Sequence, residues 1–351
     1  MKVIVPCAGR SSRFPNMPPK WMLPDHDGLP MVVRAVQGLS LKPRDMVVTI
    51  LREHEERFAA TDGLRRAFGE PVECVILDHP TASQSETVAE TLRRANVSEP
   101  FLVKDSDNFF EVDFLDEPFN YITVSSLNDF DLINARNKSY VQVDQDSVVT
   151  NIREKRVISD LFSVGGYFFR SPKDFLAAFD ELSGSTRLNE SELYISEIIG
   201  FMILGGHAFQ AKRAQRYQDW GTIHEWRTEL ERRRVFLVSV DGFLFERGSR
   251  YFAPAFEDVA PNPAAIEATL KMHALQQTLI YLSIRPPEME EMTRRQLKEQ
   301  GLPDGQIIFG CGVAQWGLVT SSHPSLPFST SRAFEIEADD VNMVDKLDLL
   351  G

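Results

Sequence analysis

The segment KVIVPCAGRSSRF, residues Lys2–Phe14, decides the fold of the N-terminal part of the chain. It begins with a short apolar run rich in β-branched residues, which is typical of a buried strand. Gly9 and a loop of serines and arginines follow this run directly. A strand that leads into a glycine loop predicts an α/β sheet in which this loop lies at the carboxyl edge, where such folds bind ligands.

The residues that follow alternate between short apolar runs and longer helical stretches. This alternation predicts an α/β layer fold with a largely parallel sheet, because parallel strands need crossover connections. The expected strands are Met46–Leu51, Val72–Leu77, Phe101–Asp105 and Tyr121–Leu127. The expected helices are Pro30–Leu39, Glu53–Phe68, Ser85–Ala95, Pro172–Leu182 and Glu190–Leu204, and a hairpin is expected over Tyr140–Arg153.

The pattern restarts near residue 230, which predicts two domains, over residues 1–231 and 232–351. The second domain is expected to be a smaller α/β unit. Its helix after Asn262 has a capping residue and a proline at the first helical position. The expected elements are strands at Val235–Val240, Thr278–Leu282 and Gln306–Phe309, and helices at Asn262–Gln277 and Glu288–Gln300.

Composition excludes several classes of protein. Lysine and arginine number 38 and aspartate and glutamate 51, so the net charge is −13. Such an acidic chain lacks the basic surface that non-specific nucleic-acid binding requires. The three cysteines form no close pair, which argues against a disulfide framework or a zinc site. No run of about 18 apolar residues or N-terminal signal stretch is present, so we expect a cytoplasmic protein without a membrane partner.

The loop after the first strand is the first candidate for chemistry. Gly9 allows the backbone to approach a ligand closely, and successive loop amides can surround phosphate oxygens. Arg13 supplies a planar set of donors and Lys20 a point charge. A surface turn with solvated cations is the alternative interpretation. The strand immediately before the loop favours a phosphate-binding site.

Two acidic segments could hold a metal ion. Asp105 and Asp107 follow a predicted strand, and Asp219 stands in the later segment Asp219–Thr222. Mg²⁺ is typically held by one or two carboxylates together with substrate phosphates. Ordinary Asp/Asn turns are the alternative for both segments.

Two further segments carry polar side chains that suit substrate contacts. Gln84, in Thr81–Thr87, could read a base edge or belong only to a helix cap. Glu154 and Lys155 could bind a sugar hydroxyl and a phosphate, or form a solvated charge pair.

Taken in order, these motifs resemble those of the sugar-phosphate nucleotidylyltransferases, the NDP-sugar pyrophosphorylases and their choline-phosphate cytidylyltransferase relatives, over about residues 1–230. The family loop G-x-G-S-R-F with a later P-K is matched by Gly9, Ser12, Arg13, Phe14, Pro19 and Lys20, with Ser11 in place of the middle glycine. The family segment T-x-G-Q-x-x-T is matched by Thr81, Gln84 and Thr87, with Ser83 in place of glycine. Further matches are Asp107, Glu154–Lys155, Gly165–Phe169, Glu192–Glu197 and Asp219–Thr222.

This resemblance implies a Rossmann-like domain with a mostly parallel mixed sheet and a Mg²⁺-dependent nucleotidylyl transfer that releases pyrophosphate. It implies that Arg13, Lys20 and Asp107 are catalytic and that Asp107 and Asp219 hold the metal. The nucleotide-binding residues would be Ala8, Gly9, Ser11, Ser12, Arg13, Lys20, Gln84 and Asp105. The acceptor-binding residues would be Glu154, Lys155, Tyr167 and Glu192.

The substrates follow from the same resemblance. We expect a nucleoside triphosphate, with CTP slightly preferred over GTP, UTP and dTTP, and a sugar phosphate or similar phosphomonoester as acceptor. A role in surface-polysaccharide precursor synthesis and a homo-oligomer are also expected. A glycosyltransferase that uses a nucleotide sugar, or a protein that binds nucleotide without turnover, are the alternatives. Arg13 and Lys20 favour a triphosphate over a nucleotide sugar.

Residues 235–351 resemble a small haloacid-dehalogenase-like (HAD) phosphatase domain, in Ser239–Leu244 and Ser283–Pro286. The family's D-x-D-G-T-L requires an aspartate nucleophile, and this chain has Ser239 there, with Asp241 as the second acidic residue. The late acidic pair of the family is missing near Gly317–Val319; Asp339 and Asp340 are the alternative. We expect a non-hydrolytic unit, and phosphatase activity in it is the alternative.

Overall fold

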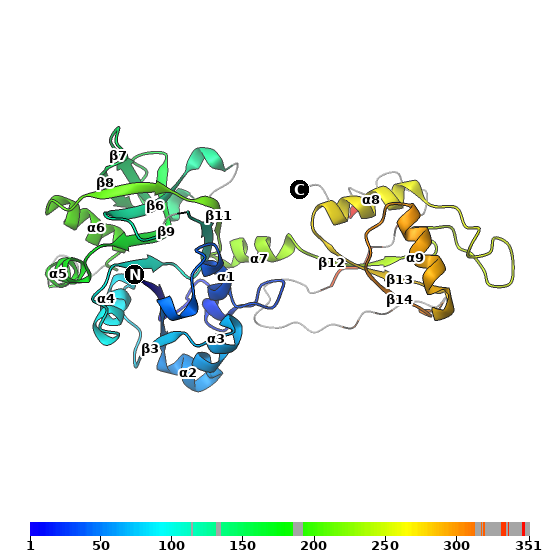
Figure 1. Cartoon of the computed structure of the whole chain (residues 1–351), viewed down its shortest axis with the longest axis horizontal. Coiled ribbons are helices and arrows are strands. Elements are labelled where there is room, and N and C mark those ends of the chain that lie inside the picture. The colour runs from blue at the N-terminus through cyan, green and yellow to red at the C-terminus, as the bar shows by residue number, and fades with distance from the viewer. Residues whose placement is uncertain are drawn as a thin grey trace. The chain divides into compact units, whose positions relative to one another are not determined.

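The chain divides into two compact units, Met1–Glu225 and Trp226–Gly351. The computed structural model describes residues 1–113, 115–130, 135–184, 192–312, 317, 319, 331–334, 336 and 346–347. Figure 1 labels the helices and strands of both units. Within the described residues, no helix combines the length and the apolar character that a membrane span requires. The alternative acidic pair, Asp339 and Asp340, lies outside the described residues.

The first unit is built on a nine-stranded mixed sheet. Its central path has the order β10-β6-β9-β4-β1-β2-β3, and β7 and β8 attach to β9 through β7. Neighbours pair parallel from β4 through β1 and β2 to β3, whereas β9 is antiparallel to β4 and β6. The predicted α/β fold with a largely parallel mixed sheet is confirmed. The bounds are β1 (Lys2–Pro6), β2 (Met46–Leu51), β3 (Glu73–Leu77), β4 (Phe101–Lys104), β6 (Asn120–Ser126), β7 (Ser139–Val143), β8 (Val149–Glu154), β9 (Leu161–Phe169) and β10 (Phe209–Arg213).

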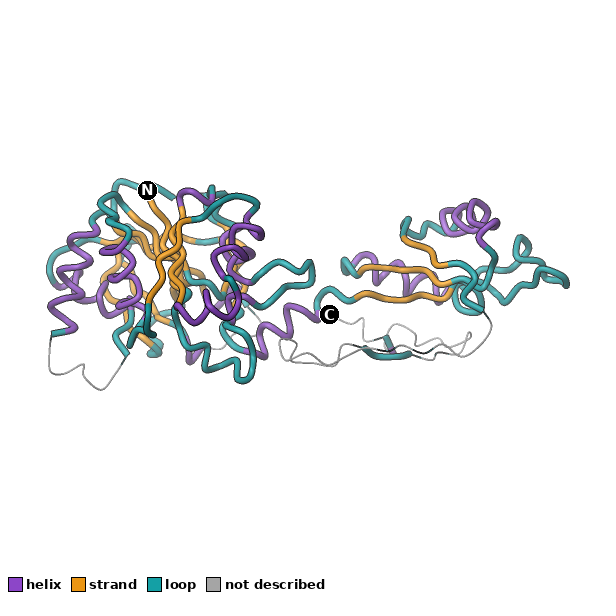
Figure 2. Tube along the Cα trace, turned by 90° about the horizontal axis from the view of Figure 1, so that it is seen from below, coloured by secondary structure: helices purple, strands orange, loops and turns teal. Residues whose placement is uncertain are grey.

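Helices cover both faces of this sheet, so its strands are apolar on both sides. In β1, Ile4 packs into one core, while Val3 and Val5 pack into the other. Figure 2 shows the strands of the first unit between two layers of helices. The Ile4 side carries α4 (Gln84–Arg94), α5 (Pro172–Ser183) and α6 (Ile195–Leu204). The other side carries α1 (Met31–Gln37) and α3 (Ala60–Phe68), with α2 (Arg52–Phe58) against α3.

Two predicted helices differ from the structure because side chains cap new ends. The stretch Glu53–Phe68 is divided at Ala59, which has a φ of 47°, and Glu55 accepts hydrogen bonds from both the backbone and the hydroxyl of Thr61 at 2.8 Å. The helix predicted from Glu190 begins at Ile195, since Glu197 accepts from the backbone of Tyr194 at 2.9 Å. Its predicted start lies in residues 185–191, outside the described ranges.

A two-stranded antiparallel sheet lies beside the large one and was not predicted. It consists of β5 (Asn108–Glu111) and β11 (Gln215–Asp219). In their register Asp219 faces Asn108. The pairing therefore brings together two segments that are far apart in the sequence.

The second unit has a smaller parallel sheet in the order β12-β13-β14. Val238 and Tyr281 are buried on its strands, and Ala265 and Leu297 pack against it from the helices. Asn262 caps the first of these helices by accepting from the backbone of Ala265. The bounds are β12 (Val235–Ser239), α8 (Pro263–Ala274), β13 (Thr278–Leu282), α9 (Glu290–Glu299) and β14 (Gln306–Ile308), and α7 (Ile223–Glu231) spans the boundary between the units.

A fully buried ion pair joins the loops after β12 and β13. Arg285 Nε lies 2.7 Å from Asp241 Oδ1, and neither side chain is exposed. The hydroxyl of Ser283 donates to Asp241 Oδ2 at 2.8 Å, and Arg285 also donates to Thr293 of α9 at 3.1 Å. The carboxylate is therefore held within the protein on both of its oxygens.

Replacing Arg285 with methionine is expected to lower the free energy of unfolding by about 3–5 kcal/mol, because the buried carboxylate of Asp241 loses its counter-charge. Denaturant unfolding measures this change. Arg294→Met is the control, since Arg294 pairs with the exposed Glu290, and exposed pairs contribute about 1 kcal/mol or less. The double variant Asp241→Asn/Arg285→Met is expected to recover part of the loss. Equal, small effects of Arg285→Met and Arg294→Met would contradict the assigned role of the buried pair.

Candidate functional site

The loop after β1 is held in shape by Ser11. This residue has a φ of 49°, in the left-handed region where glycine is usual. Its carbonyl accepts from the backbone of Phe14 at 2.8 Å, and its hydroxyl accepts from the backbone of Lys20 at 3.0 Å. The serine thus keeps the glycine-like turn and adds a side-chain contact that glycine lacks. The other nucleotide-binding candidates of this loop are the buried Ala8 and the exposed Gly9 and Ser12.

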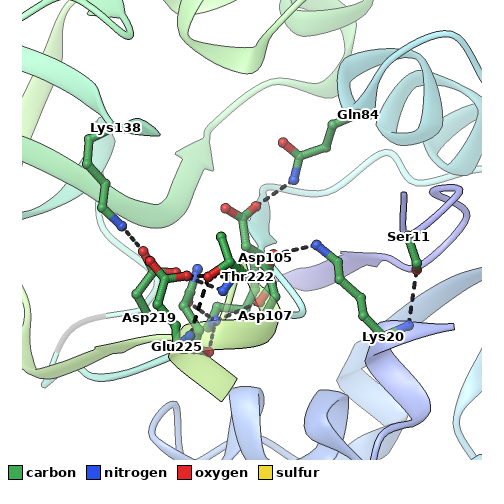
Figure 3. A network of polar contacts seen from close by, with 12 residues as sticks. Ser11, Lys20, Gln84, Asp105, Asp107, Lys138, Asp219, Thr222 and Glu225 are labelled. Carbon is green, nitrogen blue, oxygen red and sulfur yellow. Dashed lines mark hydrogen bonds and ion pairs between the residues drawn. The ribbon is translucent and has the colours of Figure 1, made fainter. Parts of the chain in front are cut away.

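Asp107 and Asp219 are brought together by the pairing of β5 with β11. Besides the pairing of Asp219 with Asn108, the backbone of Trp220 donates to the carbonyl of Asp107 at 2.8 Å. Lys20 forms an ion pair with Asp107 Oδ2. Figure 3 shows the two carboxylates close to each other at the centre of a network of polar contacts.

Gly221 marks the space that these groups share. A Cβ atom on Gly221 would lie 3.2 Å from Asp219 Oδ1, 3.4 Å from an Arg13 Nη atom and 3.5 Å from Asp107 Oδ2. One guanidinium and two carboxylates therefore converge on the space beside Gly221, where any larger side chain would contact all three. Two carboxylate oxygens that face one volume suit a hard divalent cation such as Mg²⁺, and the guanidinium suits a phosphate.

Electrostatics keep Asp107 ionised. Burial alone would raise the pKa of Asp107, but the charge and hydrogen bond of Lys20, together with Arg13, lower it to about 2. Burial and the nearby Asp107 raise the pKa of Asp105 to about 6. Asp107 is therefore the carboxylate that is ready to hold a cation at neutral pH.

Lys104 forms hydrogen bonds with this acidic loop from the interior of the protein. It was not among the predicted residues. Its side chain is fully buried, and its ammonium donates to the carbonyl of Asp105 at 2.7 Å and to Asn108 Oδ1 at 2.6 Å. Burial lowers the pKa of Lys104 to about 7. A lysine at the end of the apolar strand FLVK was the sequence signal that could have found it.

Gln84 and Asp105, both predicted to bind nucleotide, contact each other. Gln84 opens α4 after the cap Ser83, and its side-chain amide donates to Asp105 Oδ1 at 2.5 Å. The backbone of Asp105 donates to the carbonyl of Gly165 in β9 at 2.9 Å. Gly165 has a φ of 83°, and a Cβ there would lie 2.3 Å from Asp105 Oδ2. A glycine is thus required for β9 to approach this side of the site.

The acceptor candidates Glu154 and Lys155 lie at the end of β8. Glu154 Oε2 accepts from the hydroxyls of Ser139 and Ser196, the latter at 2.9 Å. Lys155 donates to the phenol of Tyr194 at 2.5 Å. These contacts join the hairpin to the start of α6 and fix both charged groups.

The other two acceptor candidates differ in exposure. Glu192 is exposed and interacts with Tyr194. Tyr167 is only 6% exposed, and its phenol interacts with Ser163 and Ser139. It offers little surface to a ligand in this arrangement.

Lys138 enters the site without any sequence signal. Its ammonium pairs with Asp219 Oδ2 and donates to the phenol of Tyr217 at 2.6 Å. Its side chain is only 6% exposed. A single lysine before a predicted hairpin carries no pattern, and tertiary contacts alone place it beside Asp219.

Comparisons with known proteins support the fold. No protein-family model and no curated protein sequence matches the chain. A nucleoside-diphosphate-sugar pyrophosphorylase from Vibrio cholerae RC9 superposes with a TM-score of 0.56 and 22% identity, over 65% of this chain and 99% of its own. A protein from Bacillus anthracis assigned as a glucose-1-phosphate thymidylyltransferase, in complex with a sucrose, gives 0.54 and 20%, over 66% and 94%. The inositol-1-phosphate CTP transferase from T. maritima gives 0.50 and 15%, over 64% and 90%.

These neighbours have the Rossmann-like fold that the resemblance implied, and that prediction is confirmed. The identities are low, so the likeness concerns the fold. It extends over about two-thirds of the chain, and the HAD-like resemblance of residues 235–351 stays a prediction.

Gly221→Ala is expected to weaken divalent-metal binding by about tenfold or more, because the new methyl group fills the space between the carboxylates. Folding is expected to be normal, since Gly221 is not among the residues with positive φ. Isothermal titration with MnCl₂ measures the affinity, and a thermal melt measures the folding. Gly63→Ala is the control, because no atom lies within 4 Å of its Cβ position. A folded Gly221→Ala with unchanged metal affinity would show that this space does not hold the cation.

Proposed function

We propose that the first unit is a Mg²⁺-dependent nucleotidylyltransferase. It joins a nucleoside triphosphate to a sugar phosphate or a similar phosphomonoester and releases pyrophosphate. The observation that carries this proposal is the convergence of Arg13, Asp107 and Asp219 on the space beside Gly221. The structural neighbours are described as a nucleoside-diphosphate-sugar pyrophosphorylase, a glucose-1-phosphate thymidylyltransferase and an inositol-1-phosphate CTP transferase, which supports the same class of reaction.

The proposed reaction is a single in-line displacement. An oxygen of the acceptor phosphate attacks the α-phosphorus of the triphosphate, the new P–O bond forms, and pyrophosphate leaves with the electron pair of the broken bond. The attacking oxygen is already anionic at neutral pH, so no strong base is required. Positioning and charge neutralisation then provide most of the acceleration.

The side chains divide this work between the two substrates. Mg²⁺ held by Asp107 and Asp219 would neutralise charge on the triphosphate and the acceptor phosphate. Arg13 would hold the triphosphate and stabilise the charge that develops on pyrophosphate. Lys20, which forms an ion pair with Asp107 in this structure, would contact the phosphates near the reacting centre. Lys155 would bind the acceptor phosphate.

The remaining candidate residues would bind other parts of the two substrates. The base, ribose and phosphates of the nucleotide would be bound by Gln84, Asp105 and the loop residues Ala8, Gly9, Ser11 and Ser12. CTP is the first triphosphate to test. Glu154 would bind acceptor hydroxyls. We further propose that the protein works in the cytoplasm as a homo-oligomer, in surface-polysaccharide precursor synthesis, without nucleic-acid or membrane partners. The second unit would have a supporting, non-hydrolytic role.

A matrix of nucleoside triphosphates against phosphorylated acceptors, scored by pyrophosphate release, tests the proposal. Release only when both substrates are present is the expected result. Consumption of a nucleotide sugar without pyrophosphate would identify a glycosyltransferase instead. Nucleotide binding without turnover with any acceptor would identify a binding protein.

Asp107→Asn is expected to lower kcat by about a hundredfold or more, because one half of the metal clamp loses its charge. Arg13→Lys is also expected to be costly, since a point charge cannot replace a planar fork. Ser239→Ala in the second unit is the control and is expected to retain full transfer activity; its hydroxyl donates to the backbone carbonyl of Asp241 at 2.9 Å. Near-normal turnover by Asp107→Asn would refute its assignment.

A further inference from the structure

Lys138 is a buried cation that the proposed reaction has not used. It precedes β7, and its ammonium lies 5.7 Å from the ring centre of Phe162 and 5.1 Å from that of Tyr217. Its ion-pair partner is Asp219. Burial of a lysine is unfavourable unless its charge is matched. Asp219 neutralises the charge of Lys138 here. A metal ion bound at the site would compete for the same carboxylate.

The two lysines of the site lie on opposite sides of the carboxylates. Figure 3 shows Lys20 reaching Asp107 from one side and Lys138 reaching Asp219 from the other. Lys20 belongs to the loop that also carries Arg13, which is the proposed triphosphate side. Lys138 belongs to the hairpin that carries Lys155, whose backbone donates to the carbonyl of Lys138 at 2.9 Å. The hairpin thus contributes Lys138 opposite Lys20, and Lys155 is its backbone neighbour.

We propose that Lys138 and Lys155 together form the cationic subsite for the phosphate of the acceptor, and that Lys138 occupies Asp219 until the metal and the acceptor bind. This inference rests on the proposed nucleotidylyltransferase function. An in-line displacement needs the acceptor on the side of the α-phosphorus away from the leaving pyrophosphate. Lys138 reaches Asp219 from the side opposite Lys20, which would be the acceptor side if Lys20 contacts the triphosphate.

The charges of the site require such a subsite. A phosphomonoester carries nearly two negative charges and must approach a region that contains Asp105, Asp107, Asp219 and Glu154. Each of these carboxylates repels it when ionised. When a divalent cation takes over Asp219, the charge of Lys138 is released from its partner and becomes available to the acceptor phosphate. The exchange keeps Asp219 neutralised before and after binding.

The proposal predicts opposite effects on two ligands. Lys138 competes with the metal for Asp219, so its removal should tighten metal binding, but the acceptor should bind more weakly. Lys155 is hydrogen-bonded to Tyr194, so its removal should weaken the acceptor alone. A lysine with only a structural role would not separate the ligands in this way.

The experiment compares Lys138→Met, Lys155→Met and the wild type as full-length proteins. Titration with MnCl₂ without substrates should show about three- to tenfold tighter binding in Lys138→Met and unchanged binding in Lys155→Met. With the substrate pair from the matrix, both variants should raise the acceptor KM by about tenfold and leave the triphosphate KM within about twofold. Lys2→Met is the control, since Lys2 begins β1 at the strand end away from the loop and pairs with Glu73.

An unchanged acceptor KM in Lys138→Met, or equal increases for both substrates, would overturn the subsite. If the wild type releases no pyrophosphate with any pair, the proposed function and the acceptor subsite fail together. The manganese titration then separately decides the competition at Asp219, and equal affinities would overturn it. If Lys138→Met does not fold, Lys138→Gln keeps a hydrogen-bonding side chain without the charge and should raise the acceptor KM selectively; a normal acceptor KM there would overturn the subsite.

Discussion

Two short strands, β5 and β11, pair antiparallel and so fix Asp219 beside Asp107. The candidate site depends on this pairing and on the backbone hydrogen bond from Trp220 to Asp107, because together they align the two acidic segments. The arrangement has an electrostatic cost, since two carboxylates that face one space repel each other. Lys20 and Lys138 each neutralise one of them, and Arg13 lies at the open space between them. The fold thus holds together a cluster of opposite charges around the space beside Gly221.

The proposed function requires an acidic protein to bind anionic substrates. The net charge of −13 would repel nucleotides at long range, but salt screens such interactions beyond about 8–10 Å. Within that range the loop after β1 and the β7–β8 hairpin supply cations from two sides. Local placement therefore outweighs overall composition.

Sequence patterns predicted most of the sheet and the opening loop, because apolar runs and a glycine after a strand are local signals. The strand Met46–Leu51 has the predicted bounds. The pairing of β5 with β11 could not be predicted, since neither strand is apolar enough to stand out and their register depends on the rest of the fold. Lys138 was missed for the same reason. The sequence could not show whether Ser11 changes the turn where the family has glycine, because its left-handed backbone conformation is seen only in the structure. The HAD-like resemblance of the second unit is still a prediction.

The buried pair of Asp241 and Arg285 has a consequence for the history of the second unit. Either residue, once replaced alone, leaves its partner as an orphan charge in the interior, and such intermediates are strongly disfavoured. The two residues are therefore expected to be kept together or replaced together.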